Sequence, residues 1–129
     1  MATWTLLYVE DSDADHYIVD LATKELDFPV RLCRVRDGEE GIWFLEKTHG
    51  YENAPTPDLV LLDLNLPKRD GFEVLAVVRA SDALRSIPVI MFTTSRAEYE
   101  KKKALALGAN DYISKPGTIT EVIETLRTA

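Results

Sequence analysis

Hydrophobic and polar positions change their spacing repeatedly along this chain, and the changes mark out alternating strands and helices. Short runs that are mostly apolar indicate strands buried on both faces, as in a parallel sheet. Such runs predict five strands, at Trp4–Val9, Pro29–Val35, Leu59–Leu62, Pro88–Phe92 and Tyr112–Ile113. The segments between and after them predict helices, at Asp13–Leu26, Gly38–Lys47, Phe72–Arg79, Arg96–Leu107 and across Ile119, Val122, Ile123 and Leu126.

A strand followed by a helix, repeated five times, predicts an α/β fold with a parallel sheet and helices on both of its faces. The 129 residues are a typical length for a single domain. No stretch resembles a linker between domains, and the last predicted helix ends close to the C-terminus. We therefore expect one domain over residues 1–129, with no output domain.

The most informative segment runs from Leu59 to Pro67, where four apolar residues lead directly into Asp63. A lone carboxylate is costly to remove from water, so a buried strand should not end in an unpaired charge. In an open α/β sheet, functional residues gather at the carboxyl ends of the strands. We therefore expect Asp63 to lie at the end of its strand with a functional role.

The other predicted strands also end in polar residues. Glu10 and Asp11 follow the first strand, Thr93 ends the fourth, and Lys115 follows the fifth. If the first and third strands are neighbours, about 4.8 Å apart, the three carboxylates would lie within a few ångströms of one another. Like charges this close require neutralisation, and a hard divalent cation such as Mg²⁺ prefers such oxygen ligands.

A lysine and a threonine at the same edge of the sheet can bind an anion. The Lys115 ammonium can neutralise a carboxylate or hold an anion that the carboxylate has acquired, and the Thr93 hydroxyl can donate to that anion. A metal ion, a lysine and a hydroxyl around one aspartate stabilise charge in the way that phosphoryl transfer requires. An aspartate can itself be the nucleophile and form an aspartyl phosphate.

Composition and charge narrow the class of protein. The net charge of −7 argues against nucleic acid as a direct partner, because basic surfaces supply the affinity for phosphate backbones. The single cysteine, Cys33, cannot form an internal disulfide, which fits a reducing cytoplasm. No signal peptide and no apolar run of the ~18 residues needed to span a membrane is present, so we expect a cytoplasmic protein without a membrane partner.

Four segments carry a resemblance to a known family. They are Tyr8–Ser12, Asp63–Gly71, Met91–Thr94 and Tyr112–Pro116, in this order on the predicted strand–helix framework. Over essentially its full length, the chain resembles the receiver domain of two-component response regulators. The resemblance implies a flavodoxin-like, doubly wound (βα)5 fold with strand order 2-1-3-4-5. The long loop before the third strand and the sequence of Asp63–Gly71 are similar to those of stand-alone regulators that partner bacterial phytochromes.

The resemblance also implies a role for each acidic residue. Asp63 would accept a phosphoryl group from a histidine kinase or phosphotransfer protein. Glu10 and Asp11 would hold Mg²⁺, or Mn²⁺ in its place, with Asp63 and the backbone carbonyl of Asn65 as further ligands. Asp13 adds negative charge beside this group and is interpreted, with Asp15, as favouring the N-terminus of the first helix.

The remaining implied roles concern the response to phosphorylation. Lys115 would contact the phosphoryl oxygens, Thr93 would move toward the phosphate, and Tyr112 would follow as a coupled aromatic switch. The Lys115–Pro116 bond is similar to a cis peptide of the family, and Gly117 stands where a larger residue is commoner. The protein would catalyse only its own phosphorylation and dephosphorylation, so it is not expected to be an enzyme.

The domain would pass its signal to another protein through its surface. The resemblance implies a partner-docking face formed by the fourth helix, the fifth strand and the fifth helix, and Lys101–Lys103 lies on that fourth helix. The phosphorylated protein would bind a downstream protein there or form a homodimer.

Two other functions compete with this hypothesis. A hydrolase of the haloacid-dehalogenase type would also use an aspartate nucleophile, but it needs a second acid where Asn65 stands. A flavodoxin-like FMN carrier needs a phosphate-binding loop after the first strand, where the acids from Glu10 to Asp13 would repel a phosphate. Turnover of a phosphomonoester and the colour of the purified protein would distinguish the two.

Overall fold

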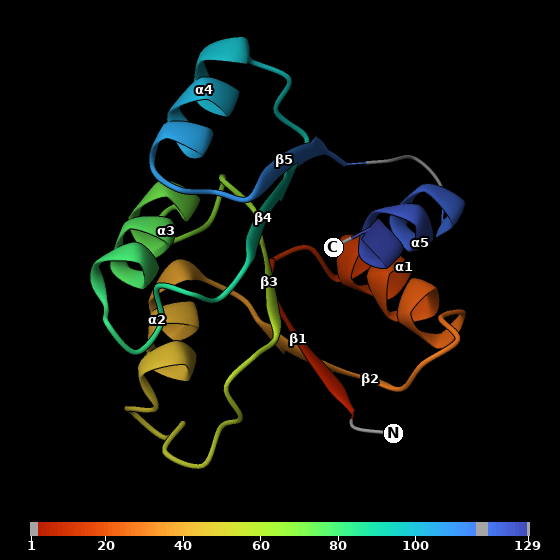
Figure 1. Ribbon diagram of the computed structural model, residues 1–129, viewed down its shortest axis with the longest axis horizontal. Coiled ribbons are helices and arrows are strands. Elements are labelled where there is room, and N and C mark those ends of the chain that lie inside the picture. The colour runs from red at the N-terminus through yellow and green to blue at the C-terminus, as the bar shows by residue number, and fades with distance from the viewer. Residues whose placement is uncertain (1–2, 116–118, 129) are drawn as a thin grey trace.

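The computed structural model describes residues 3–115 and 119–128. Five parallel strands form one sheet in the order β2-β1-β3-β4-β5, which confirms the expected topology (Figure 1). Crossovers between parallel strands place the chain's helices on the two faces of the sheet. The strands are β1 (Trp4–Val9), β2 (Val30–Val35), β3 (Leu59–Leu62), β4 (Val89–Thr93) and β5 (Asp111–Ser114).

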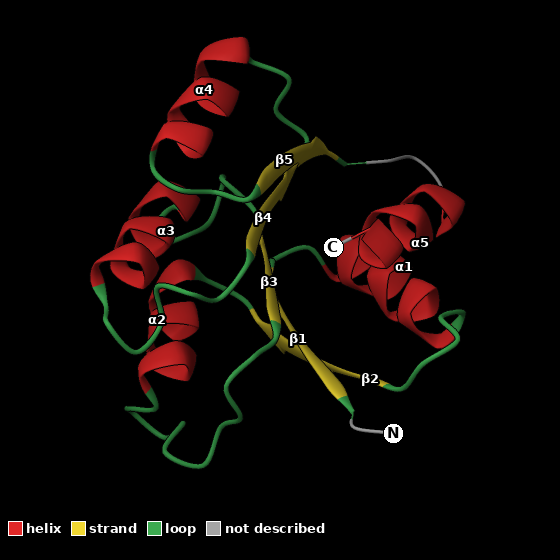
Figure 2. Cartoon of the chain, in the orientation of Figure 1, coloured by secondary structure: helices red, strands yellow, loops and turns green. Residues whose placement is uncertain are grey.

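Helices cover both faces of the sheet, as predicted. In Figure 2, α1 and α5 lie on one side, and α2, α3 and α4 lie on the other. The helices are α1 (Asp13–Lys24), α2 (Gly38–Glu46), α3 (Gly71–Ala80), α4 (Glu98–Ala106) and α5 (Ile119–Thr128).

Each face of the sheet has its own hydrophobic core. Side chains of a strand point alternately to the two faces, so Leu59 and Leu61 contribute to the core under α1 and α5. Val60 and Leu62 contribute to the core under α2 and α3. All four are at most 1% exposed. This double burial explains why the sequence of β3 is continuously apolar rather than alternating.

Side chains of the preceding loops cap the N-termini of three helices. The Ser12 hydroxyl accepts a hydrogen bond from the backbone of Asp15, and Asp37 and Asp70 cap α2 and α3 in the same way. Each such cap stabilises a helix by about 1 kcal/mol. At the start of α4, Ala97 offers no side-chain cap.

The predicted boundaries differ from the structure by a few residues. Helix α1 ends at Lys24 rather than Leu26, because Pro29 follows closely and the chain must turn into β2. Helix α4 begins at Glu98 rather than Arg96. Gly108 follows α4 with a φ of 104°, a left-handed conformation that glycine adopts readily after a helix.

Two expectations fall on Pro116 and Gly117, which lie outside the described residues. None of the described helices combines the length and apolar character needed to cross a membrane.

Candidate functional site

The polar strand ends meet at one edge of the sheet. Strands β1 and β3 are paired so that Val9 lies beside Leu62, which brings the next residues, Glu10 and Asp63, to the same edge. Both acids are buried, at 1% and 5% exposure, and Thr93 at the end of β4 is fully buried. These side chains therefore lie together at one edge of the sheet, as the sequence predicted.

Lys115 follows β5, on the far side of β4 from Asp63, and its side chain reaches the buried acids. Its Nζ lies 3.0 Å from Oδ2 of Asp63 and 2.7 Å from Oδ2 of Asp15, and it also donates to Oε1 of Glu10. The lysine side chain is only 10% exposed. One ammonium thus donates to three carboxylates, so these four groups together keep an excess of negative charge.

Burial and pairing change the proton affinity of these groups. Burial alone would lower the pKa of the Lys115 ammonium, but its hydrogen bonds to the three carboxylates outweigh this and raise the pKa above its ordinary value. Burial raises the pKa of Glu10, the hydrogen bond from Lys115 opposes the rise, and the charge of Asp63 adds to it. The lysine therefore stays charged, and although its hydrogen bond opposes the rise, the pKa of Glu10 is still raised to about 7.

Further hydrogen bonds fix the carboxylate of Glu10. The Tyr8 hydroxyl donates to Oε1 over 3.2 Å, and the backbone N–H of Ser12 donates to Oε2 over 3.1 Å. Burial and the Glu10 carboxylate raise the pKa of Tyr8, so its hydroxyl remains a donor. Glu10 is therefore held in one orientation by a tyrosine that sequence reasoning did not assign to the site.

The loop after β3 folds closely around Asp63. The backbone N–H of Asn65 donates to Oδ1 of Asp63 over 3.3 Å, while Oδ2 faces Lys115. The N–H of Gly71 donates to the carbonyl of Leu64 over 3.0 Å. A Cβ atom at Gly71 would lie 2.3 Å from the carbonyl oxygen of Asp63, so this position has room only for glycine.

The two predicted switch residues, Thr93 and Tyr112, are linked through Ser95. The backbone N–H of Ser95 donates to the hydroxyl of Thr93 over 3.3 Å. The hydroxyl of Tyr112 donates to the carbonyl of Ser95 over 3.1 Å, and its side chain is buried. A displacement of Thr93 would therefore reach the aromatic ring through the same short segment.

Arg34 of β2 is a site residue that the sequence did not reveal. Its Nε donates to the carbonyl of Glu10 over 2.9 Å, and its Nη1 donates to Asp13 over 2.8 Å. The Nη2 atom is buried and lacks a hydrogen-bond partner within the described residues. The arginine thus holds both ends of the acidic loop between β1 and α1. An arginine inside a mostly apolar strand was the only signal for it.

The acids of the first α1 turn do more than predicted. Asp13 and Asp15 do lie in that turn. However, Asp13 binds Arg34 and Arg36 at 2.8 and 2.9 Å, and Asp15 binds Lys115. The interpretation as helix-terminal charges alone was therefore incomplete.

The donor set suits a hard divalent cation. Asp11 is exposed beside the buried Glu10, and Asp63 and the backbone of Asn65 lie across the same edge. These are oxygen donors, which Mg²⁺ and Mn²⁺ accept, and the excess negative charge favours a cation. In the described part of the chain, no three acidic, histidine or cysteine side chains form a ready cage. A cation here would keep several of its waters.

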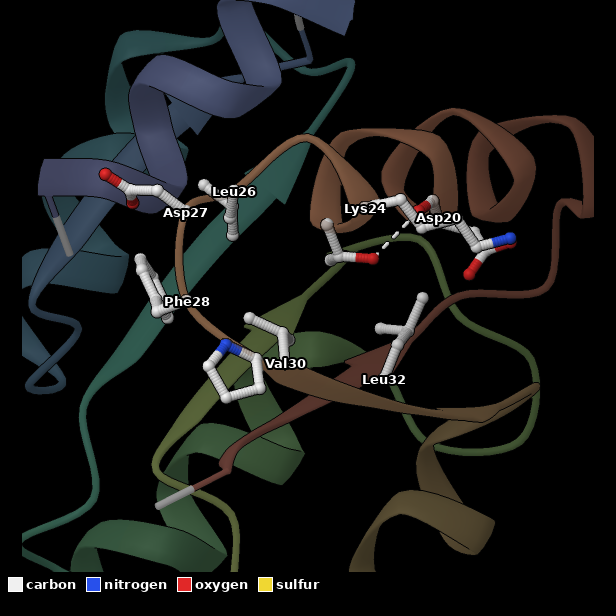
Figure 3. Close-up of a pocket in the computed structure, with 9 residues that line it drawn as sticks. Asp20, Lys24, Leu26, Asp27, Phe28, Val30 and Leu32 are labelled. Atoms are coloured by element: carbon white, nitrogen blue, oxygen red, sulfur yellow. Dashed lines mark hydrogen bonds and ion pairs between the residues drawn. The ribbon is translucent and has the colours of Figure 1, made fainter. Parts of the chain in front are cut away.

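A hollow of about 740 Å³ lies elsewhere, between the end of α1 and the start of β2 (Figure 3). Leu26, Phe28, Val30 and Leu32 form its apolar wall, with Asp20 and Lys24 near its rim. None of the residues predicted for the site lines this hollow. The residues predicted for the site therefore lie at the acidic edge of the sheet and not at this hollow.

Comparison with known proteins agrees with this geometry. The response regulator Rcp1 of Synechocystis sp. is 38% identical over 122 residues, which cover 95% of this chain and 83% of Rcp1. The crystal structure of the Mn²⁺-bound form of Rcp1 superposes with a TM-score of 0.88, covering 97% of this chain and 90% of the other.

A second solved structure, the phosphorylated cyanobacterial phytochrome response regulator RcpA, is 36% identical. It superposes with a TM-score of 0.91 and covers 98% of this chain and 91% of that chain. The family model of the response regulator receiver domain matches residues 6–127. By its fold, its acidic edge and this match, the chain belongs to the family of response regulator receiver domains.

Proposed function

We propose that Asp63 is the residue of this receiver domain that accepts the phosphoryl group. The observation that carries the proposal is the environment of its carboxylate, which is buried at the sheet edge with Oδ2 held 3.0 Å from Lys115. A carboxylate oxygen would attack the phosphorus of a phosphohistidine on the donor. The P–N bond breaks as the P–O bond forms, and the released imidazole takes up a proton.

A divalent cation would bind beside Asp63. Glu10, Asp11, Asp63 and the backbone carbonyl of Asn65 would hold it, and the Mn²⁺-bound form of the relative Rcp1 supports this. We propose Mg²⁺ as the usual ion and Mn²⁺ as a substitute. When bound, the cation supplies positive charge to the phosphoryl oxygens during transfer.

Lys115 and Thr93 would then respond to the new charge. Lys115 already donates to Asp63, so its ammonium is placed to contact a phosphoryl oxygen on that residue. The Thr93 hydroxyl would turn from Ser95 toward the phosphate, and Tyr112 would adjust because its hydroxyl is bound to the same Ser95 segment. In this proposal the chemistry is confined to the protein itself, so the domain has no turnover of outside substrates.

The signal would pass to a protein partner. We propose the face of α4, β5 and α5 as the docking surface, and exposed apolar side chains of α4 and its end support this. Tyr99 is 73% exposed, Leu105 43% and Leu107 38%. A downstream protein or a second phosphorylated copy of the chain would cover them, with no direct contact to nucleic acid or membrane.

The phosphodonor would be a histidine kinase or a phosphotransfer protein. The relative RcpA is a phytochrome response regulator, so a phytochrome-type kinase is the first donor to test. We propose a cytoplasmic location, as expected from the sequence, where such a kinase would meet the protein.

Labelling with acetyl phosphate and Mg²⁺ tests this function. We expect the unaltered protein to take up one phosphoryl group and the Asp63→Asn variant to take up none. Asp82→Asn is the matched control, because the Asp82 side chain is 94% exposed and forms an ion pair with Arg85, three residues along the chain. Undiminished labelling of Asp63→Asn would disprove the assignment, and steady hydrolysis of an added phosphomonoester would favour a phosphatase instead.

A further inference from the structure

Lys115 has no free hydrogen-bond donor. An ammonium group carries three N–H donors, and its nitrogen contacts three carboxylates, those of Glu10, Asp15 and Asp63. A phosphoryl group on Asp63 would add new oxygen acceptors next to the same nitrogen. The N–H that now donates to Asp63 can pass to one phosphoryl oxygen, and the lysine can donate to a second phosphoryl oxygen only if it releases Glu10 or Asp15.

The three carboxylates differ in how easily they can leave. The side chain of Glu10 is 1% exposed and that of Asp63 is 8% exposed, whereas that of Asp15 is 34% exposed. A buried carboxylate that lost its ammonium would remain unpaired at high cost. Asp15 reaches water directly, so hydration can replace its contact with the lysine.

The surroundings of Asp15 also allow the change. A small cavity of about 20 Å³ lies between α1, α5 and the sheet, and both Asp15 and Lys115 line it. This is about the room that one water molecule needs. The backbone of Asp15 is fixed separately, because its N–H donates to the Ser12 hydroxyl over 3.2 Å. The side chain can therefore turn away without disturbing the helix.

We propose that Asp15 is the exchangeable counter-ion of Lys115, which holds one lysine donor before phosphorylation and yields it to the phosphoryl group. Asp15 is thus a positioning residue that acts through Lys115. The inference rests on the proposed function of Asp63 and deepens it. Its consequence is that Asp15 lowers the affinity of the site for a phosphoryl group, because the contact between Asp15 and Lys115 must be broken first.

Affinity for a phosphoryl mimic tests the proposal. Beryllofluoride with Mg²⁺ would be titrated calorimetrically into the unaltered protein and into the Asp15→Asn and Asp15→Ala variants. We expect both variants to bind about two- to fivefold more tightly, the range of a half-exposed ion pair. A role in structural support alone would give the opposite sign, so unchanged or weaker binding would overturn the proposal.

The matched control is Asp20→Asn. Asp20 lies on the same helix, is 37% exposed and pairs with Lys24 at 3.3 Å, so the substitution removes an equal charge of similar exposure. Its affinity should equal that of the unaltered protein. Thermal unfolding of each variant verifies that it is folded, and the isosteric Asp15→Asn keeps the test valid if Asp15→Ala unfolds.

A double-mutant cycle separates the contact from a general charge effect. In a Lys115→Met background, the gain from Asp15→Asn should vanish, because Asp15 then has no ammonium to release. A gain that persists would show simple charge repulsion and would overturn the proposal. Labelling of the unaltered protein by acetyl phosphate is measured in parallel. If it labels normally while the Asp15 variants bind no more tightly, only the Asp15 inference fails. If it takes no label, the proposed function fails as well.

Discussion

The ammonium of Lys115 lies 3.0 Å from the carboxylate of Asp63, although the two residues are 52 positions apart in the chain. The contact crosses the end of β4 and joins the ends of β3 and β5. Because the lysine is also bound to Glu10 and Asp15, it is the cation that holds four separate segments together at this edge. Its removal should affect stability as well as chemistry.

Lys115→Met should therefore destabilise the protein in a way that Mg²⁺ partly restores. Removing one partner from a buried ionic group costs about 3 kcal/mol, because the remaining carboxylates repel one another. A divalent cation can replace the lost positive charge, so the rise in melting temperature on adding Mg²⁺ should be larger in the variant. Thermal unfolding with and without Mg²⁺ measures both effects.

The control for this change is Lys24→Met. Lys24 is 68% exposed and pairs with Asp20 within one helix, so its loss should cost less than about 0.5 kcal/mol. An equal Mg²⁺ response in the two variants would contradict the role given to Lys115.

Arg34→Met should weaken metal binding although Arg34 is not a metal ligand. The arginine fixes the carbonyl of Glu10 and the carboxylate of Asp13, and without it the acidic loop loses its orientation. Changes to such supporting residues typically cost about tenfold or more in metal affinity. Arg36→Met is the control, because the Arg36 side chain also pairs with Asp13, at 2.9 Å, but is 60% exposed. Among the described residues, only Arg34 donates to the carbonyl of Glu10. Calorimetric titration with Mg²⁺ should separate the two variants, and equal affinities would reject the idea.

Gly71→Ala should damage both the loop and the acceptor. The added methyl group would meet the backbone oxygen of Asp63, so the loop or the strand end must shift, at a cost of about 1–3 kcal/mol. At Gly41 the same methyl would lie 3.3 Å from the side chain of Val9, which can adjust. Gly41→Ala should therefore lose less stability in urea unfolding and keep a normal labelling rate. Comparable losses at both glycines would contradict this reading.

The core of the fold follows closely from sequence. The bounds of β3 were predicted to the residue, because a strand buried on both faces must be continuously apolar and must stop where Asp63 begins. Helix ends were less predictable. The end of α1 depends on how Glu25 and Leu26 turn toward β2, which involves local hydrogen bonds that no periodicity encodes.

The site was predictable where its residues follow strands, and not where they depend on side-chain contacts. Glu10, Asp63 and Thr93 follow from the rule that parallel strands end at one edge. Asp15 contacts a residue 100 positions away, and Arg34 contacts one 24 positions away. Such contacts arise from the packing of α1 and β2 against the sheet, and residue types alone do not specify them.

His16 gives the protein a pH dependence that one substitution can isolate. Burial, together with the charge of Arg34, lowers the pKa of His16 below its ordinary value of 6.5. As the pH falls below 6.5, the unfolded chain takes up a proton before the folded one does, so the free energy of unfolding decreases. His16→Gln removes this contribution. Compared with the variant, the unaltered protein should lose stability in urea unfolding as the pH falls through 6.5 and below. A stability difference that stays constant over this range would show that His16 takes up its proton equally in both states.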